Sequence, residues 1–150
     1  MVGFINMIPY FVAGVVMIFV GQYSDRTGER RKIVAAAAVT AAVGFALAAY
    51  FTNPYLAMAA LTLAFVGIKS TIGPFWAIST AFLSGTAAAG GIALINSVGN
   101  LGGFFGPFLV GLIKDKTGSD VAAMLLLGGS LLMMGLLACT LRNPARLPND

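Results

Sequence analysis

The chain has 150 residues, of which only 9% are charged and 59% are hydrophobic. A soluble domain carries about 25% charged residues, and one of this length could not bury so much apolar surface, so the composition excludes a soluble globular protein. The net charge of +4 could suggest nucleic-acid binding, but the basic residues gather at the ends of apolar runs and form no continuous stripe, which argues against a nucleic-acid partner.

Four windows without a charged residue are each long enough to span a membrane, since about 20 apolar residues cross a hydrocarbon layer of ~30 Å. These windows cover residues 1–24, 33–68, 70–113 and 121–141. The opening residues have no basic segment and no small-residue cleavage pattern, so the first window is predicted to be a spanning helix and not a removed signal peptide. The sequence therefore predicts an all-α, polytopic membrane protein.

Charges and turn residues divide these windows into five predicted transmembrane helices. They cover residues 2–21, 32–51, 56–82, 87–113 and 121–141. A turn is predicted at residues 52–55, because Asn and Pro favour turns. The third helix is long enough to tilt or bend, and Gly73-Pro74 is its predicted break. Five crossings place the two ends of the chain on opposite sides of the membrane.

The loop between the first two helices, residues 21–32, holds six of the fourteen charged residues. If this loop is cytoplasmic, that side also receives the basic residues of the carboxyl-terminal tail. The cytoplasmic set is then Arg26, Arg30, Arg31, Lys32, Arg142 and Arg146, against Lys114 and Lys116 on the other side. The positive-inside rule therefore predicts an amino terminus outside and a carboxyl terminus in the cytoplasm. The expected location of this multi-pass protein is the inner (plasma) membrane.

The same loop carries a spaced motif, Gly21-x-x-x-Asp25-Arg26-x-Gly28-x-Arg30-Arg31. It resembles the signature loop of the major facilitator superfamily, which follows the second and the eighth of twelve helices. The segments PFWAISTAFLSGTAAA and GGIALINSVGNLGGFFGP are similar to helices ten and eleven of one branch, the anion:cation symporters, which include phthalate, tartrate and sugar-acid permeases. The resemblance covers essentially all of residues 1–150, as helices eight to twelve of a carboxyl-terminal transmembrane half-domain.

The resemblance implies part of a secondary active transporter that moves an organic anion, a sugar acid or a dicarboxylate, by alternating access with a coupling cation, expected to be a proton. Its partner is the missing amino-terminal half, helices one to seven, in which this family carries its proton-coupling residues. Besides the anion and the coupling cation, membrane lipid is the other expected partner, and no cofactor or metal is expected. The alternative is a truncated, non-transporting fragment or a membrane scaffold or assembly subunit.

The motif residues of the first loop are expected to act as a conformational latch. The set is Gly21, Asp25, Arg26, Gly28, Arg30 and Arg31. Asp25 is predicted to lie just past a helix end, where its carboxylate meets a helix amino terminus and a neighbouring cation. The alternative is a solvated cytoplasmic turn that only satisfies the topology rule. The full motif spacing favours the latch.

A polar stripe is predicted on the third helix. At 100° per residue it contains Thr62, Lys69, Gly73, Trp76 and Thr80. Lys69 falls near the middle of the helix, where a cation costs ~2.5–3.5 kcal/mol on insertion scales. The stripe predicts a water-filled cavity in which Lys69 attracts a carboxylate, Trp76 stacks or donates a hydrogen bond, and Thr80 completes the binding set. Alternatively, Lys69 snorkels or bonds to helix-end carbonyls, and Trp76 is an interfacial anchor.

Two asparagines, Asn96 and Asn100, lie one turn apart in the fourth helix. A carboxamide offers both a donor and an acceptor, as recognition of a sugar-acid hydroxyl requires, so both are predicted to bind substrate. The resemblance places Asn96 at a position that contacts substrate in the family. The alternative for both is hydrogen bonding between helices. Asn6 and Tyr10 form a weaker polar pair on the first helix, with the same two readings.

Glycines of the fourth helix form two ridges, Gly99 with Gly103 and Gly102 with Gly106, which predict the close approach of another helix backbone. They are not a phosphate-binding loop, since no strand precedes them and no Lys-Ser or Lys-Thr pair follows. Cys139 has no partner for an internal disulfide or a metal site. The sequence contains no His and no Ser, His and acid set, so no enzymatic activity is expected.

Overall fold

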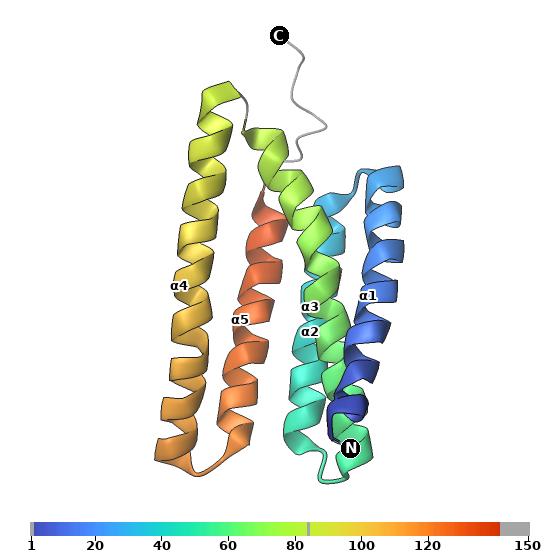
Figure 1. Cartoon of the computed structure of the whole chain (residues 1–150), viewed down its shortest axis with the longest axis vertical. Coiled ribbons are helices and arrows are strands. Elements are labelled where there is room, and N and C mark those ends of the chain that lie inside the picture. The colour runs from blue at the N-terminus through green and yellow to red at the C-terminus, as the bar shows by residue number, and fades with distance from the viewer. Residues whose placement is uncertain (1, 84, 142–150) are drawn as a thin grey trace.

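The structure is a computed structural model that describes residues 2–83 and 85–141, with the side chains of residues 2–6, 86 and 87 outside the description. It contains five helices: α1 Val2–Thr27, α2 Arg30–Tyr50, α3 Pro54–Phe82, α4 Gly85–Thr117 and α5 Asp120–Thr140 (Figure 1). Each is long and apolar enough to cross a membrane. The predicted all-α, five-helix membrane class is therefore confirmed.

The first turn is much shorter than the sequence predicted. α1 continues to Thr27 instead of ending near residue 21, so only Gly28 and Glu29 separate it from α2. No residue between 22 and 27 breaks a helix, and charge alone does not end one. Gly28 ends it, because its φ of +66° lies in the left-handed region that favours glycine. The Gly28 amide donates to the carbonyl of Ser24 at 3.0 Å.

The turn between α4 and α5 is also shorter than predicted, for the same reason. α4 continues to Thr117, past the predicted end at residue 113, and Gly118 (φ +64°) stops it. The Gly118 amide donates to the carbonyl of Lys114 at 2.8 Å. Ser119 then caps α5, since its side-chain oxygen accepts from the amide of Val121 at 3.2 Å.

The long third helix begins earlier than predicted and does not break. Asn53 caps it by accepting from the amide of Tyr55 at 2.9 Å, and Pro54 occupies the first helical position, where a missing N–H costs least. α3 then runs through Gly73 and Pro74 without interruption, so the predicted break is wrong. In Figure 1 the upper part of α3 inclines away from α1.

Helix α2 lies at the centre of the helix packing. It packs along α3 on one side and α5 on the other, while α1 packs against α3. α4 contacts α5 to a small extent and α3 hardly at all. No residue of α4 whose side chain is described is buried. Both the α1–α2 turn and the end of α5 lie at the end of the molecule opposite the α4–α5 turn (Figure 1).

The tightest packing is between α2 and α3, where small residues bring the two backbones together. Buried small residues repeat with spacings of four and three: Ala37, Ala41, Gly44 and Ala48 on α2, and Ala60, Ala64, Gly67 and Thr71 on α3. A Cβ added at Gly44 would lie 2.7 Å from the Cα of Ala64, and one added at Gly67 would lie 2.6 Å from the carbonyl oxygen of Ala37. Only glycine fits at these two positions.

The predicted close approach at the glycine ridges of α4 is not found. A Cβ added at Gly99, Gly102, Gly103 or Gly106 would meet nothing within 4 Å in the described part of the chain. Close helix packing therefore lies at the α2–α3 seam and not at α4, where the glycine spacing predicts it. Alanine supplies most of that seam, and alanine is also common on lipid-facing surfaces, so the pattern did not stand out.

Candidate functional site

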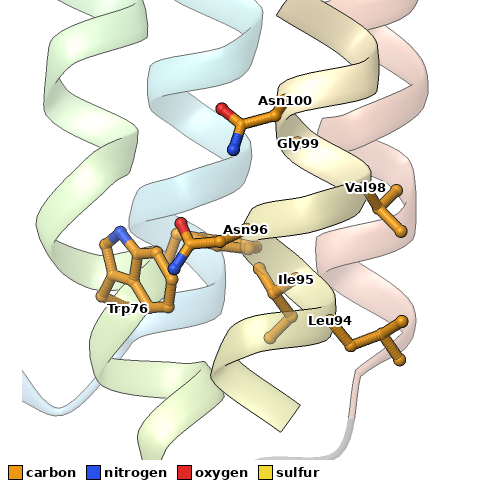
Figure 2. Close-up of a pocket in the computed structure, with 8 residues that line it drawn as sticks. Trp76, Leu94, Ile95, Asn96, Val98, Gly99 and Asn100 are labelled. Carbon is orange, nitrogen blue, oxygen red and sulfur yellow. The ribbon is translucent and has the colours of Figure 1, made fainter. Parts of the chain in front are cut away.

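A pocket of about 560 Å³ lies between α3 and α4. It is lined by Phe75, Trp76, Leu94, Ile95, Asn96, Val98, Gly99 and Asn100 (Figure 2). Two of these residues come from α3 and six from α4, which hardly touch each other elsewhere. The pocket therefore occupies the space that two spread helices leave beyond their short connection.

Polar groups of both helices point into this space. Figure 2 shows the carboxamides of Asn96 and Asn100 projecting from α4 towards α3, with the indole of Trp76 beside Asn96. Val98 points the other way. Residues four apart on a helix have Cβ atoms about 5–6 Å apart, so the two carboxamides follow each other along one face. Both asparagines are exposed, and Trp76 is half-buried.

These groups offer hydrogen-bond donors and acceptors at the pocket. Neither carboxamide nor the indole N–H forms a hydrogen bond with any side chain or backbone group that the structure describes, so their donors and acceptors remain available. Phe75 packs edge-on against Trp76, with the ring centroids 5.7 Å apart, and adds an apolar wall. Phe75 was missed by the sequence analysis, because an aromatic residue beside Trp76 carries no polar signal.

Two of the five predicted binding residues, Lys69 and Thr80, lie outside this lining. Thr80 directs its hydroxyl back to its own helix, donating to the carbonyl of Trp76 at 2.8 Å. Thr62, a stripe residue outside the five, does the same with the carbonyl of Met58, also at 2.8 Å. Lys69 is half-buried and does not line the pocket. The structure thus brings Trp76, Asn96 and Asn100 together and leaves Lys69 and Thr80 apart from them.

Lys69 lies on the same side of α3 as Trp76 but at a different level. Seven residues advance a helix by about 10 Å and turn it by nearly two whole turns, so one stripe contains both residues without bringing them together. The Lys69 Nζ lies 5.5 Å from the centroid of the Phe65 ring. Phe65 in turn packs edge-on against Tyr10 of α1, with the centroids 4.5 Å apart. The side chain of Asn6, the predicted partner of Tyr10, lies outside the described residues.

Comparison with known proteins decides the family. The sequence model of the Major Facilitator Superfamily matches residues 1–150. The chain belongs to the Major Facilitator Superfamily. Membership in this family of transporters agrees with the expectation that the chain is not an enzyme.

Curated members of the superfamily resemble the whole of this chain but are much longer. A putative tartrate transporter of Agrobacterium vitis is 48% identical over 140 residues, which cover 93% of this chain and 31% of that protein. A second putative tartrate transporter of the same organism is 44% identical, over 96% of this chain and 33% of that protein. A quinolone resistance transporter of Acinetobacter baumannii is 36% identical, over 82% and 28%. The chain thus spans about a third of the length of these relatives, and no solved structure matches it.

The superfamily motif at the α1–α2 turn connects four helices. The Arg30 Nη2 lies 3.7 Å from Asp25 Oδ1, across the turn, and the Arg30 Nη1 donates to the carbonyl of Ala77 in α3 at 3.2 Å. Arg31 donates to the carbonyl of Leu141, the residue that follows α5. Asp25 lies inside the last turn of α1 and not past its end, so that part of the prediction is wrong. Arg30 is its cationic neighbour.

The other motif residues make fewer contacts. Gly21 is half-buried in α1, and nothing lies within 4 Å of where its Cβ would be. Arg26 is exposed and forms no ion pair with the described residues. Gly28 sets the turn. Nearby, Lys32 pairs with Glu29 at 3.0 Å.

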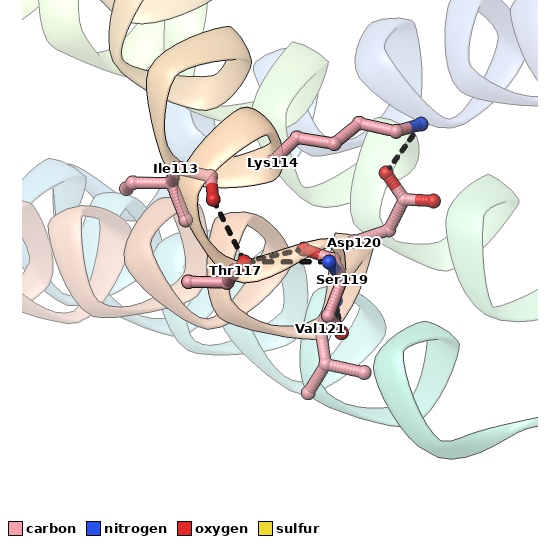
Figure 3. Close-up of polar contacts among 6 residues, drawn as sticks. All are labelled: Ile113, Lys114, Thr117, Ser119, Asp120 and Val121. Atoms are coloured by element: carbon pink, nitrogen blue, oxygen red, sulfur yellow. Dashed lines mark hydrogen bonds and ion pairs between the residues drawn. The ribbon is translucent and has the colours of Figure 1, made fainter.

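At the opposite end of this superfamily member, the α4–α5 turn has its own polar contacts (Figure 3). The Lys114 Nζ lies 2.8 Å from Asp120 Oδ1. The Thr117 hydroxyl donates to the carbonyl of Ile113 at 2.7 Å and accepts from the amide of Ser119 at 3.3 Å. These contacts connect α4 to α5 across a turn of two residues. The charged residues at this end therefore belong to the helix ends and not to a long loop. Arg142 and Arg146, which the topology prediction places with the motif turn, lie outside the described residues.

Proposed function

We propose that this chain forms helices eight to twelve of a secondary active transporter that moves a small organic anion, a sugar acid or a dicarboxylate such as tartrate, by alternating access. The observation that carries the proposal is the pocket that Trp76, Asn96 and Asn100 line together. It lies between α3 and α4, two helices that otherwise hardly touch. The names of the two Agrobacterium vitis relatives suggest tartrate. The remaining helices of the transporter would complete the site.

The chemistry of the pocket supports an acid that also carries hydroxyl groups. Asn96 and Asn100 each offer a donor and an acceptor, which suits hydroxyl and carboxylate groups together. The Trp76 indole offers an apolar face and one N–H donor. Lys69 adds a positive charge on the same side of α3, one level away, which favours an anion over a neutral sugar. Thr80 remains a weaker candidate, because its hydroxyl is already bonded to its own helix.

The motif turn supports alternating access. Its arginines connect the α1–α2 turn to α3 and to the end of α5, so the ends of four helices move as one body when the turn moves. We propose that the motif residues Gly21, Asp25, Arg26, Gly28, Arg30 and Arg31 form a latch that grips the other half of the transporter in one access state. Rocking of two such bodies around a central site is how many transporters expose it to each side in turn.

The coupling ion is proposed to be a proton. The five helices carry charged side chains mainly near their ends, and Lys69 is the exception at membrane depth. A proton-carrying carboxyl group would therefore come from helices one to seven. The motif turn is proposed to face the cytoplasm of a cell with this protein in its inner membrane, with the amino terminus of the chain outside.

Counterflow uptake by the complete transporter in proteoliposomes tests the proposed site. Labelled tartrate would be compared with a galactonate, a phthalate and a neutral sugar. We expect Trp76→Leu and Asn96→Ala each to weaken anion binding about five- to 150-fold, because an unpaired polar group in a binding site costs ~1–3 kcal/mol. Ser97→Ala is the matched control, since Ser97 is exposed on α4 but does not line the pocket. Unchanged anion binding in both pocket variants would overturn the site.

A second candidate is a membrane fragment or assembly subunit without transport of its own. It is favoured by the absence of buried residues from the described side chains of α4. The size of the native protein in its own membrane decides between the two candidates, because the first requires helices one to seven in the same protein or in a bound partner, and this one does not.

A further inference from the structure

The positive charge of Lys69 has no negative partner in the described part of the chain. The residue is half-buried near the middle of α3, and no described carboxylate lies within 4.0 Å of its Nζ. A lysine at this depth normally pairs, faces water or snorkels to an interface. In the described part of the chain, the structure places an aromatic ring beside the ammonium group.

Phe65 supplies that contact. It lies one turn before Lys69 on the same helix, and the Nζ is 5.5 Å from the centre of its ring. The face of an aromatic ring attracts a cation because its quadrupole is negative there, and the interaction extends to about 6 Å. The ring holds the ammonium group without a formal negative charge.

Tyr10 of α1 holds the ring in turn. Its centroid lies 4.5 Å from that of Phe65, with an angle of 65° between the two ring planes. This edge-to-face packing restrains the orientation of Phe65 across the α1–α3 contact. Tyr10, Phe65 and Lys69 therefore contact one another in series, from α1 to the Trp76 side of α3.

We propose that Phe65, restrained by Tyr10, is a positioning residue that keeps the Lys69 ammonium group on the Trp76 side of α3 as an uncompensated cation for the transported anion. The inference rests on the proposed function. A carboxylate partner would also hold Lys69, but it would cancel the charge that the anion needs. The aromatic ring holds the flexible Lys69 side chain and leaves its charge uncancelled. The entropic cost of ordering this side chain when the anion binds is therefore smaller.

A nuclear magnetic resonance measurement tests the contact without any substrate. The measurement uses the complete transporter labelled with ¹³Cε-lysine, in which the Lys69→Arg variant assigns the signal of Lys69, because only that signal is lost. In lipid nanodiscs we expect the Lys69 signal to be shifted by the ring current of Phe65. Phe65→Leu should remove that shift and Phe65→Tyr should keep it. A Lys69 signal that Phe65→Leu leaves in place would overturn the proposal.

Anion binding by the complete transporter tests the consequence. We expect Phe65→Leu to weaken tartrate binding about five- to thirty-fold, and Phe65→Tyr to restore it, because the tyrosine ring keeps the cation–π face. Tyr10→Phe is the matched control for α1, since it removes only the hydroxyl. In a Lys69→Met background, Phe65→Leu should have no further effect, which a purely structural role of Phe65 would not predict.

The two proposals can fail separately. If Trp76→Leu and Asn96→Ala weaken anion binding while Phe65→Leu does not, the positioning role is wrong and the proposed function stands. If none of these variants weakens it, the proposed function is wrong, and the ¹³C signal alone decides whether Phe65 holds Lys69. Thermal unfolding of each variant of the complete transporter in detergent identifies any variant that misfolds. If Phe65→Leu misfolds, Phe65→Tyr remains as the test, because it should behave as the wild type in every assay, and loss of anion binding in it would contradict the proposal.

Discussion

Arg30, the first residue of α2, donates a hydrogen bond of 3.2 Å to the carbonyl of Ala77 on α3, a residue 47 positions later in the sequence. The same guanidinium lies 3.7 Å from the carboxylate of Asp25 in the last turn of α1. One side chain thus joins the ends of three helices. The planar fork of arginine allows this, because it can reach two acceptors in different directions.

The first prediction concerns this arginine. Arg30→Gln should destabilise the helix bundle by about 1.5–3 kcal/mol, since it removes a hydrogen bond and an ion pair from a partly buried charged group. Arg30→Lys should recover only part of the loss, because a lysine cannot contact both acceptors in the same way. Thermal or denaturant unfolding of the complete transporter in detergent measures the change. Arg26→Gln, at an exposed position of the same turn, is the control and should change stability by less than about 0.5 kcal/mol.

The second prediction concerns the seam between α2 and α3. Gly44→Ala should destabilise the fold by about 1–3 kcal/mol, because the added Cβ would press on the backbone of α3. Gly14→Ala is the control. Gly14 also lies inside a helix, and nothing is within 4 Å of where its Cβ would be.

Gly44→Ala and Gly14→Ala are expected to change the free energy of unfolding in opposite directions. Alanine favours a helix over glycine by about 0.4–1 kcal/mol where it fits, so Gly14→Ala should be neutral or stabilising. The measurement is the free energy of unfolding of the complete transporter in mixed micelles. A stabilising Gly44→Ala would mean that α2 and α3 do not approach as closely as described.

The third prediction concerns orientation in the membrane. In a variant with Cys139→Ser, single cysteines would be introduced as Glu29→Cys, in the α1–α2 turn, and Ser119→Cys, in the α4–α5 turn. A maleimide that cannot cross membranes should label the Ser119→Cys protein from outside intact cells and the Glu29→Cys protein only after permeabilisation, as the positive-inside rule requires. The reverse labelling pattern would contradict the proposed topology.

The fourth prediction concerns the chain by itself. α4 has no buried residue among its described side chains, and its glycine ridges face no described neighbour. Such surfaces favour helix association in a membrane, so the isolated chain should oligomerise or unfold in detergent. Size-exclusion chromatography with light scattering measures the mass, and a stable monomer at high dilution would contradict this prediction.

The candidate site could be predicted in part. Asn96 and Asn100 are polar residues one turn apart, so a shared face follows from helix geometry, and Trp76 lies on a polar stripe that the sequence also shows. Lys69 lies on that stripe as well, yet it does not line the pocket. Helical periodicity predicts the side of a helix and not the level along it that a neighbouring helix reaches. The inclination of α3 and the position of α4 decide that level.

The packing of α2 and α3 could not be predicted in the same way. In a soluble helix the apolar face identifies the buried side, but a membrane helix is apolar all round, because its other faces meet lipid. The sequence therefore gives no sign that Gly44 and Gly67 are the points of closest approach. The helix ends differ from prediction for a related reason, since Gly28 and Gly118 end α1 and α4 through backbone conformation and not through polarity.

The amino-acid sequence by itself determined that this chain crosses a membrane five times and that its first turn carries a superfamily motif. Both follow from sums and spacings of residues, because the hydrocarbon layer selects for long apolar segments whatever their partners are. Only the tertiary structure decided which helix faces meet, which binding candidates share a pocket, and which side chain holds Lys69. Those outcomes depend on distances between atoms of different helices, and residue types along one helix do not specify them.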